Sequence, residues 1–343
     1  MTTAKEKTAD CLRAYPARAA VELNSLDDQF WERAEDGGVA VVIAQQLGVR
    51  IPRTERAHLE STVASMRSQA VTEKLLTICD EMGIRALPLK GPYLAHRLYG
   101  DASWRPTSDV DLLVAPRDAP RLVARLAREG GEVPEAHVHA FYMANHHHLT
   151  AVWMDVLIEI HFRATSSFGV RMESEPLLER ATAARVAGRQ VLILDPTDEL
   201  IYLATHAAAH YCAHDILLLD LKLFVARYGV DWREVERRAH ALHLDRAVGC
   251  ALVAAERRTG LDTSSMREGW RAKSRDVLRF VPADLPPGYV DDWRIRARAH
   301  LAHAQLCATK RLAAAALARD ALRAVKRRVH AAFPRTAPTS WEV

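Results

Sequence analysis

The segment DVDLLVA, residues 109–115, constrains the fold more than any other part of the chain. Its apolar run predicts a buried β-strand, and side chains alternate between the two faces of a strand. Asp109 and Asp111 should therefore project from the same face, where two carboxylates repel each other unless a cation lies between them. A solvated strand start is the alternative, but the apolar run favours a pair that holds Mg²⁺.

A third acid could complete this site. Glu159 lies in VLIEIHF, residues 156–162, between two isoleucines of a predicted central strand. A carboxylate buried there needs a partner, which is either a metal ion or a nearby arginine. If the partner is metal, Asp109, Asp111 and Glu159 together could hold two Mg²⁺ ions.

A phosphate-binding turn is indicated upstream, in LPLKGPYL. A strand that ends at Lys90-Gly91 and leads directly into a helix presents free backbone N–H groups at the start of that helix. Gly91 would allow close approach of an anion, and Lys90 would add positive charge unless it is a simple surface lysine. A triphosphate turn followed by an acid pair on the next strand is what nucleotidyl transfer from an NTP requires.

The periodicity predicts an α+β fold, with a small mixed β-sheet as the core, helices before it and a helical domain after it. A helix break is expected at Gly37-Gly38, and the short strand RQVLILD should add to an edge. The expected division is a flexible tail, an N-terminal helical segment, an α/β core, a C-terminal helical domain and a second tail, at residues 1–25, 26–84, 85–195, 196–333 and 334–343.

Charge and cysteine usage restrict the class of protein. The net charge is only +4, from 47 basic and 43 acidic residues, which suits a phosphate-bearing ligand and argues against a large RNA partner. The five cysteines form no C-x-x-C pair, as in a protein with reduced thiols. No signal peptide or bilayer-length apolar run is evident, so a cytoplasmic location without a membrane partner is expected.

The chain resembles the uncharacterised bacterial nucleotidyltransferases of the polymerase-β-like superfamily. The resemblance rests on Lys90-Gly91, Tyr99, Arg105 and the Asp109-x-Asp111 strand, and extends over about residues 26–260. Further matches are the Glu159-x-His161-Phe162 strand, the helices around Trp31, Asp198-Glu199-Leu200 leading into His206 and His210, and Asp231-Trp232. Two departures are Lys-Gly where the superfamily usually has Gly-Ser or Gly-Gly, and glutamate at a position where the family more often has aspartate.

The resemblance implies a Mg²⁺-dependent enzyme that moves a nucleoside monophosphate from an NTP to a hydroxyl or similar group and releases pyrophosphate. It implies catalytic and metal-binding roles for Asp109, Asp111 and Glu159. Nucleotide contacts are expected from Lys90, Gly91, Arg105, Ser108, His161, His206 and His210. For Arg105, bracing the acidic loop is an equal alternative. The acceptor stays open between a small molecule, a peptide or protein side chain and a tRNA end, and the oligomeric state is not indicated.

Other interpretations remain. A non-catalytic nucleotide-binding or regulatory module of the same fold would lack one of the acids, and all three are present. His206, His210 and His214 recur every four residues on one helix face, so a zinc-dependent hydrolase is a further alternative. The run His146-His147-His148 reads as structural or cleft-lining, and a metal-binding role is the less favoured alternative. The basic helix at residues 309–330 reads as a solvated face rather than a nucleic-acid or membrane site.

Overall fold

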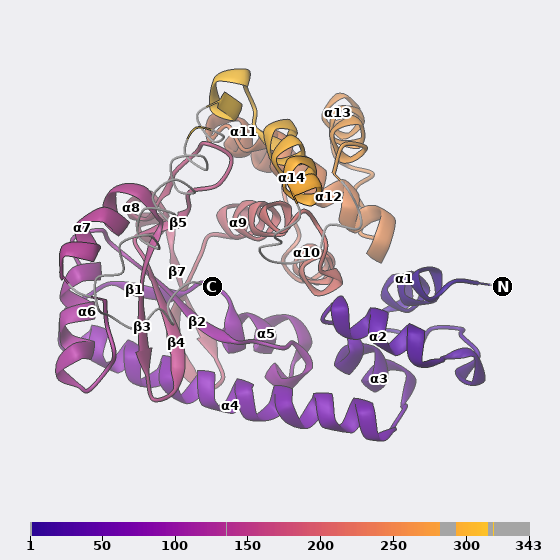
Figure 1. Ribbon diagram of the computed structural model, residues 1–343, viewed down its shortest axis with the longest axis horizontal. Helices are drawn as coiled ribbons and strands as arrows, with labels where there is room; N and C mark the ends of the chain where they lie inside the picture. The colour runs from indigo at the N-terminus through magenta and orange to yellow at the C-terminus, as the bar shows by residue number, and fades with distance from the viewer. Residues whose placement is uncertain (1, 135, 282–292, 315–317, 319–343) are drawn as a thin grey trace.

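The computed structural model describes residues 2–134, 136–281, 293–314 and 318. The fold is α+β, as expected. A small mixed sheet packs against helices that precede it and helices that follow it in the sequence (Figure 1). The expected tail at 334–343 and most of the basic helix at 309–330 lie outside the described residues. Among the described residues, none of the helices combines the length and the apolarity needed to span a bilayer.

The central sheet has four strands in the order β1-β2-β4-β3. These are β1 (Ala86–Pro88), β2 (Asp109–Val114), β3 (His148–Trp153) and β4 (Val156–His161). Strands β2 and β4 pair in parallel, whereas β1 pairs with β2 and β3 with β4 in antiparallel fashion. The predicted strands before Lys90-Gly91, at residues 109–115 and at residues 156–162 are confirmed as β1, β2 and β4.

One face of the sheet is wholly apolar. Val110, Leu112, Ile158 and Ile160 are buried there in one hydrophobic cluster with side chains of α4 (Pro52–Glu81) and α6 (Ala119–Arg128). Helix α4 runs beneath the sheet and continues to the N-terminal helices (Figure 1). Because alternate side chains of β2 and β4 point into this core, Asp109, Asp111, Glu159 and His161 project from the opposite face.

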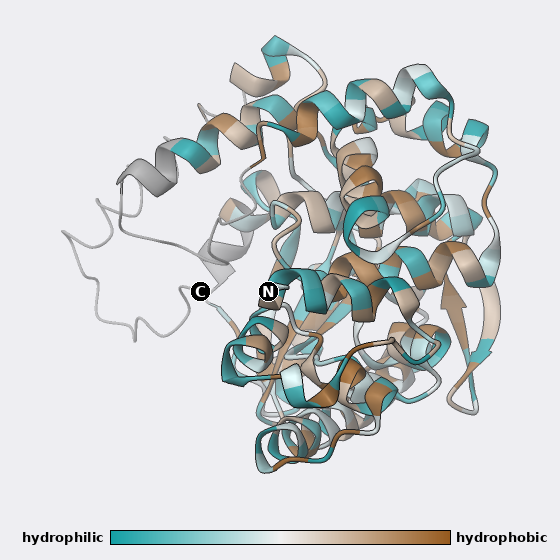
Figure 2. Ribbon diagram, turned by 90° about the vertical axis from the view of Figure 1, so that its right-hand side faces the viewer, coloured by the Kyte–Doolittle hydropathy of each residue, from teal (hydrophilic) through white to brown (hydrophobic). Residues whose placement is uncertain are grey.

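The C-terminal helices form a second core beside that opposite face. They are α9 (Pro196–Ala209), α10 (Asp215–Tyr228), α11 (Trp232–Ala241), α12 (Asp245–Thr259), α13 (Glu268–Leu278) and α14 (Trp293–Leu306). Their apolar side chains cluster with Leu113 of β2, and hydrophobic segments gather toward the interior of this region (Figure 2). Helix α9 ends at Ala209 and α10 begins at Asp215, and in the segment between them Tyr211 and Cys212 have positive φ.

The N-terminal region differs from expectation at its beginning. Residues 1–25 were expected to be a flexible tail, but they contain α1 (Ala4–Ala14), whose Cys11 and Leu12 are buried. A capping box of Thr3 and Glu6 begins this helix, which packs in one cluster with α2 (Asp28–Asp36) and α3 (Ala40–Leu47). The break at Gly37-Gly38 between α2 and α3 is confirmed.

The remaining elements are short. They are α5 (Gly91–Tyr99), α7 (Ala136–Asn145), α8 (Ser174–Arg180), the 3₁₀ turns at Leu23–Ser25 and Ala102–Trp104, and the strands β5 (Arg163–Thr165), β6 (Met172–Glu173), β7 (Thr182–Val186) and β8 (Arg189–Ile193). Strand β8, expected as an edge strand, pairs with β7 in a two-stranded sheet of its own. Strands β5 and β6 form another such pair.

Candidate functional site

The parallel register of β2 and β4 places Asp111 directly opposite Glu159. His161, two residues further along β4, lies on the same face and contacts both acids. Its Nε2 is 2.9 Å from Asp111 Oδ1 and 3.2 Å from Glu159 Oε2. The ligand atoms of Asp111, Glu159 and His161 all lie within 4.8 Å of one another, so these three residues could hold a metal ion.

Asp111 is the most buried member of this group, with 2% of its surface exposed. Lys90 Nζ lies 3.0 Å from Asp111 Oδ2, on the side opposite His161 Nε2 at Oδ1. Burial alone would raise the pKa of Asp111, but the Lys90 charge and the His161 hydrogen bond outweigh it and hold that pKa well below its usual value. Asp111 is therefore a carboxylate neutralised by two cationic partners.

The contacts that lower the pKa of Asp111 raise the pKa of His161. Its side chain is 3% exposed, and burial alone would lower its pKa. The hydrogen bonds to Asp111 and Glu159 outweigh burial and raise the pKa of His161 to about 9. In the metal-free chain the ring is consequently cationic at neutral pH.

Asp109 occupies the edge of the group. It is half-buried at the start of β2, and burial followed by the charge of Asp111 raises its pKa. Among the described residues, Asp109 belongs to no set of three ligands whose atoms lie within 4.8 Å of one another. Ser108, immediately before it, is exposed. The structure thus gathers Asp111, Glu159 and His161 tightly and leaves Asp109 beside them.

The predicted phosphate turn leads into α5. Lys90 is the residue before this helix, and its side chain makes no capping hydrogen bond. Gly91 has φ +65°, a conformation that favours glycine, and a Cβ built there would lie 3.8 Å from the carbonyl oxygen of Asp109. The first turn of α5 therefore begins close to the backbone of Asp109, at the start of β2.

Arg105 is engaged elsewhere. Its guanidinium forms a bidentate ion pair with Asp220 of α10, which also accepts a hydrogen bond from Tyr99. Arg105 and Asp220 are 5% and 1% exposed. Of the two roles considered for Arg105, this geometry corresponds to bracing the loop before the acids. Asp220 had no signal in the sequence.

Helix α9 brings two further side chains to the site. Tyr202 is buried, and burial raises its pKa, opposed by Lys90 and assisted by the charges of Asp111 and Glu159. Burial and then the charge of Lys90 lower the pKa of His206, one turn later. Tyr202 was missed in the sequence because an aromatic residue in an apolar helix reads as core.

The second histidine group, His206, His210 and His214, extends from α9 past its C-terminal end to the start of α10. The His206 and His210 rings are 4.7 Å apart, and His210 is exposed at the end of α9. Within the described part of the chain, His206, His210 and His214 are not among the sets of ligands close enough to share a metal ion. His147 and His148 do form such a set with His161.

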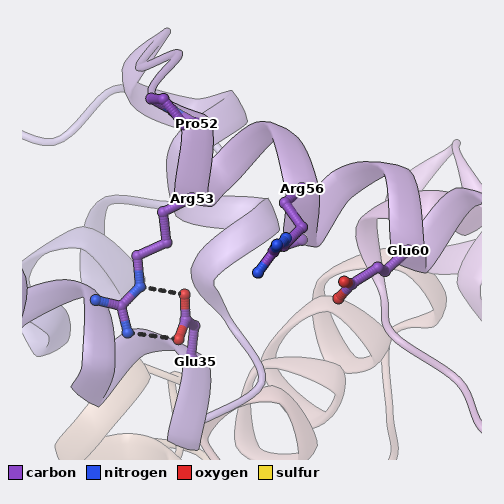
Figure 3. A pocket seen from close by; sticks show the side chains of 6 residues that line it. Glu35, Pro52, Arg53, Arg56 and Glu60 are labelled. Carbon is purple, nitrogen blue, oxygen red and sulfur yellow. Dashed lines mark hydrogen bonds and ion pairs between the residues drawn. The ribbon is translucent and has the colours of Figure 1, made fainter.

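A cavity of about 740 Å³ lies away from the acids, between α2 and the start of α4. It is lined by Glu35, Pro52, Arg53, Arg56, Ala57 and Glu60, and the ion pair of Arg53 with Glu35 closes one side of it (Figure 3). A neighbouring pocket of about 290 Å³ shares Glu35 and Glu60 and extends to Pro106 and Thr107, just before the acid strand.

The α+β core thus brings acids of two adjoining strands together close to the start of α5. The family of uncharacterised nucleotidyltransferases matches residues 29–260, more than half of the chain. The chain belongs to this family and is a nucleotidyltransferase. No curated protein matches the chain.

Two solved structures show similarity, both of the antibiotic-resistance factor ANT(2'')-Ia. One is its solution structure, at 17% identity and a TM-score of 0.39, covering 52% of this chain and 91% of that one. The other is a crystal structure in complex with adenylyl-2''-tobramycin, at 17% identity and a TM-score of 0.38, covering 50% of this chain and 95% of that one.

Proposed function

We propose that this enzyme transfers a nucleoside monophosphate from an NTP to a hydroxyl or similar group of a small-molecule or peptide acceptor, with Mg²⁺ as the required ion and pyrophosphate as the second product. The proposal rests on the proximity of Lys90, Asp111 and Glu159 in the structure. They come from the start of α5, from β2 and from β4, and the Lys90–Asp111 contact is 3.0 Å.

The carboxylates suit Mg²⁺. Asp111 and Glu159 are adjacent across the register, and Asp109 lies on the same strand face. Carboxylate oxygens are the protein ligands that Mg²⁺ prefers. These three acids would hold the ions, of which two are proposed. When bound, Mg²⁺ would neutralise charge on the triphosphate and lower the pKa of the acceptor hydroxyl.

Lys90 and the first turn of α5 would bind the β- and γ-phosphates. An ammonium group and unpaired backbone N–H groups at a helix N-terminus both attract anions. Lys90 already contacts Asp111, so an arriving triphosphate would share this cation with the carboxylate. The positive φ of Gly91 lets the backbone turn at this point without a side chain between the N–H groups and the phosphates.

Glu159 is the proposed acceptor for the proton of the attacking hydroxyl. Its side chain is 21% exposed, in contrast to the fully enclosed side chain of Asp111, so solvent and an acceptor can reach it. His161 would orient it by donating from Nε2 to Oε2. Tyr202 and His206 would line the nucleotide side of the site from α9.

A binding experiment tests this assignment. We expect one or more of ATP, GTP, CTP and UTP to raise the melting temperature of the chain only when Mg²⁺ is present, because a ligand of the native state stabilises it by mass action. The shift should vanish in the double variant Asp109→Asn with Asp111→Asn. Asp155→Asn, an exposed acid in the β3–β4 turn, is the matched control and should keep it.

Two outcomes would contradict the proposal. One is a magnesium-dependent shift of unchanged size in the double variant. The other is no shift with any of the four nucleotides in the wild type. Release of pyrophosphate from the responding NTP, followed in mixtures of hydroxyl-bearing acceptors, then identifies the acceptor class.

A further inference from the structure

The histidine run before β3 contributes two rings to a cluster at the edge of the sheet. The rings of His147, His148 and His161 lie with centroids 4.5, 5.3 and 5.2 Å apart. A nitrogen atom from each of the three lies within 4.8 Å of the other two. This cluster is distinct from the set formed by Asp111, Glu159 and His161, although His161 belongs to both.

The backbone holds this cluster in place. His148 and His161 are register partners on β3 and β4, so their side chains stand side by side on one face. The carbonyl oxygen of His147 accepts hydrogen bonds from the backbone N–H groups of Phe162 and Arg163, at 3.0 and 3.1 Å. His146 takes a different direction, since its ring stacks on Tyr142 with a centroid distance of 4.5 Å.

The hydrogen bonds determine which nitrogen atoms are free to bind a ligand. Both partners of His161 Nε2 are carboxylate oxygens, so this nitrogen carries the proton. Among the described residues, the buried Nδ1 of His161 has no hydrogen-bond partner. Nδ1 of His148 makes no hydrogen bond either, and it lies 3.6 Å from Glu159 Oε2. A buried polar atom without a partner is costly and commonly marks the place of a water molecule or an ion.

His147 has one nitrogen engaged. Its Nδ1 lies 3.3 Å from Ser166 Oγ, which leaves Nε2 available. One nitrogen atom of each of the three imidazoles lies within 4.8 Å of a nitrogen atom of the other two. A tetrahedral zinc ion with Zn–N distances of about 2.0–2.1 Å requires nitrogen atoms roughly 3.3 Å apart, which falls within the 4.8 Å limit on the separation of these atoms.

We propose that His147, His148 and His161 form a binding site for one divalent transition-metal ion of the zinc type. Imidazole nitrogen suits zinc, cobalt and nickel, whereas Mg²⁺ prefers oxygen ligands. The hydrogen bond from His161 Nε2 to Asp111 is the outer contact that orients a metal-binding histidine through a carboxylate. Three protein ligands leave a fourth position for water or a substrate oxygen.

This site is separate from the proposed Mg²⁺ site and does not depend on the transfer reaction. It differs in ligand chemistry, with nitrogen in place of oxygen. The two sites touch through His161 and Asp111, so metal at the nitrogen site would fix His161 with its Nε2–H toward Asp111. Asp111 would in this way serve as a ligand in one site and as a positioning residue for the other.

The test is a Co²⁺ titration of the full-length chain after chelator treatment and dialysis, followed by visible absorption. We expect one equivalent of Co²⁺ to bind in the presence of excess Mg²⁺. The double variant His147→Gln with His148→Gln should bind it at least ~100-fold more weakly, since two of the three ligands are lost. His206→Gln with His210→Gln, which changes the other clustered histidines, is the matched control and should bind Co²⁺ as the wild type does.

Three outcomes would overturn the proposal: no Co²⁺ binding by the wild type, displacement of Co²⁺ by Mg²⁺, or equal binding by the His147/His148 variant. Circular dichroism checks that this variant is folded. X-ray absorption of the zinc-loaded wild type needs no variant. Three imidazole nitrogen atoms at about 2.0–2.1 Å support the site, and a shell of oxygen atoms alone refutes it.

Discussion

Arg105 and Asp220 lie 115 positions apart in the sequence and form a buried bidentate ion pair, with Nε–Oδ1 and Nη2–Oδ2 distances of 3.0 and 2.9 Å. The pair connects the loop that precedes the acids with α10 of the C-terminal helices. Tyr99, at the end of α5, donates a hydrogen bond to the same carboxylate at 2.8 Å. Asp220 thus ties both segments that flank the candidate site to one point of the helical region.

Removing one partner of this pair should destabilise the chain strongly. Asp220→Ala leaves the Arg105 charge buried without its partner, so we expect the free energy of unfolding to fall by about 3–5 kcal/mol. Urea unfolding followed by circular dichroism measures it. The double variant Arg105→Met with Asp220→Leu removes both charges and should lose clearly less. A loss in the double variant as large as that in Asp220→Ala would show that the charges themselves are not the cause.

Replacing Lys90 should weaken nucleotide binding. Lys90→Met removes the cation proposed to contact the β- and γ-phosphates, and hydrogen bonds to charged groups contribute about 1.5–3 kcal/mol. The dissociation constant of the responding NTP at saturating Mg²⁺ should rise roughly 10- to 100-fold by calorimetry. Lys74→Met makes the same charge change at an exposed position of α4 and should leave the dissociation constant of the NTP unchanged. Equal effects of the two variants would indicate a nonspecific charge effect.

Gly91 and Gly100 offer a matched comparison at the two ends of α5. Both have positive φ, +65° and +81°, so alanine at either position should cost about 1 kcal/mol of folding stability. Only Gly91→Ala places a methyl group beside the free N–H groups of the first turn. We therefore expect Gly91→Ala to weaken NTP binding and Gly100→Ala to leave it intact, as measured by titration of each folded variant. Unchanged affinity in Gly91→Ala would remove the phosphate turn from the proposal.

The charge on His161 makes a prediction about pH in the metal-free chain. Its pKa is raised to about 9, so the ring is charged in the folded chain at pH values where it is neutral in the unfolded chain. The stabilisation is complete below the unfolded value of about 6.5 and is lost as the pH rises through about 9. Thermal unfolding in EDTA should show this decline in the wild type. His161→Gln cannot titrate, and an identical decline in that variant would contradict the assignment.

The local features of the site were visible in the sequence. The apolar runs of DVDLLV and VLIEIH predict two strands with their acids on one face, and the structure has both strands. The Lys90-Gly91 turn into α5 also follows from local chemistry, because glycine at a positive φ and a proline at the start of a helix are short-range signals. The Thr3-x-x-Glu6 capping box was an equally local signal for α1, and it was overlooked.

The long-range features were not visible. That β2 pairs in parallel with β4, and Asp111 therefore with Glu159, depends on the order of strands in the sheet, which single strands do not encode. The partner of Arg105 could not be chosen among many acids without the packing of α10. The helix ends after Ala209 at His210, Tyr211 and Cys212, which are weak helix formers, and Tyr211 and Cys212 adopt positive φ there.

The parallel register of β2 and β4 makes the site sensitive to insertions or deletions within β4. Successive residues of β4 point alternately toward α4 and toward the face of the acids. A single residue inserted between Val156 and Glu159 would therefore turn the side chains of Glu159 and His161 into the apolar core. Their places would pass to neighbouring isoleucines. Substitutions remove one group at a time, whereas such an insertion would dismantle the acid site and the histidine cluster together.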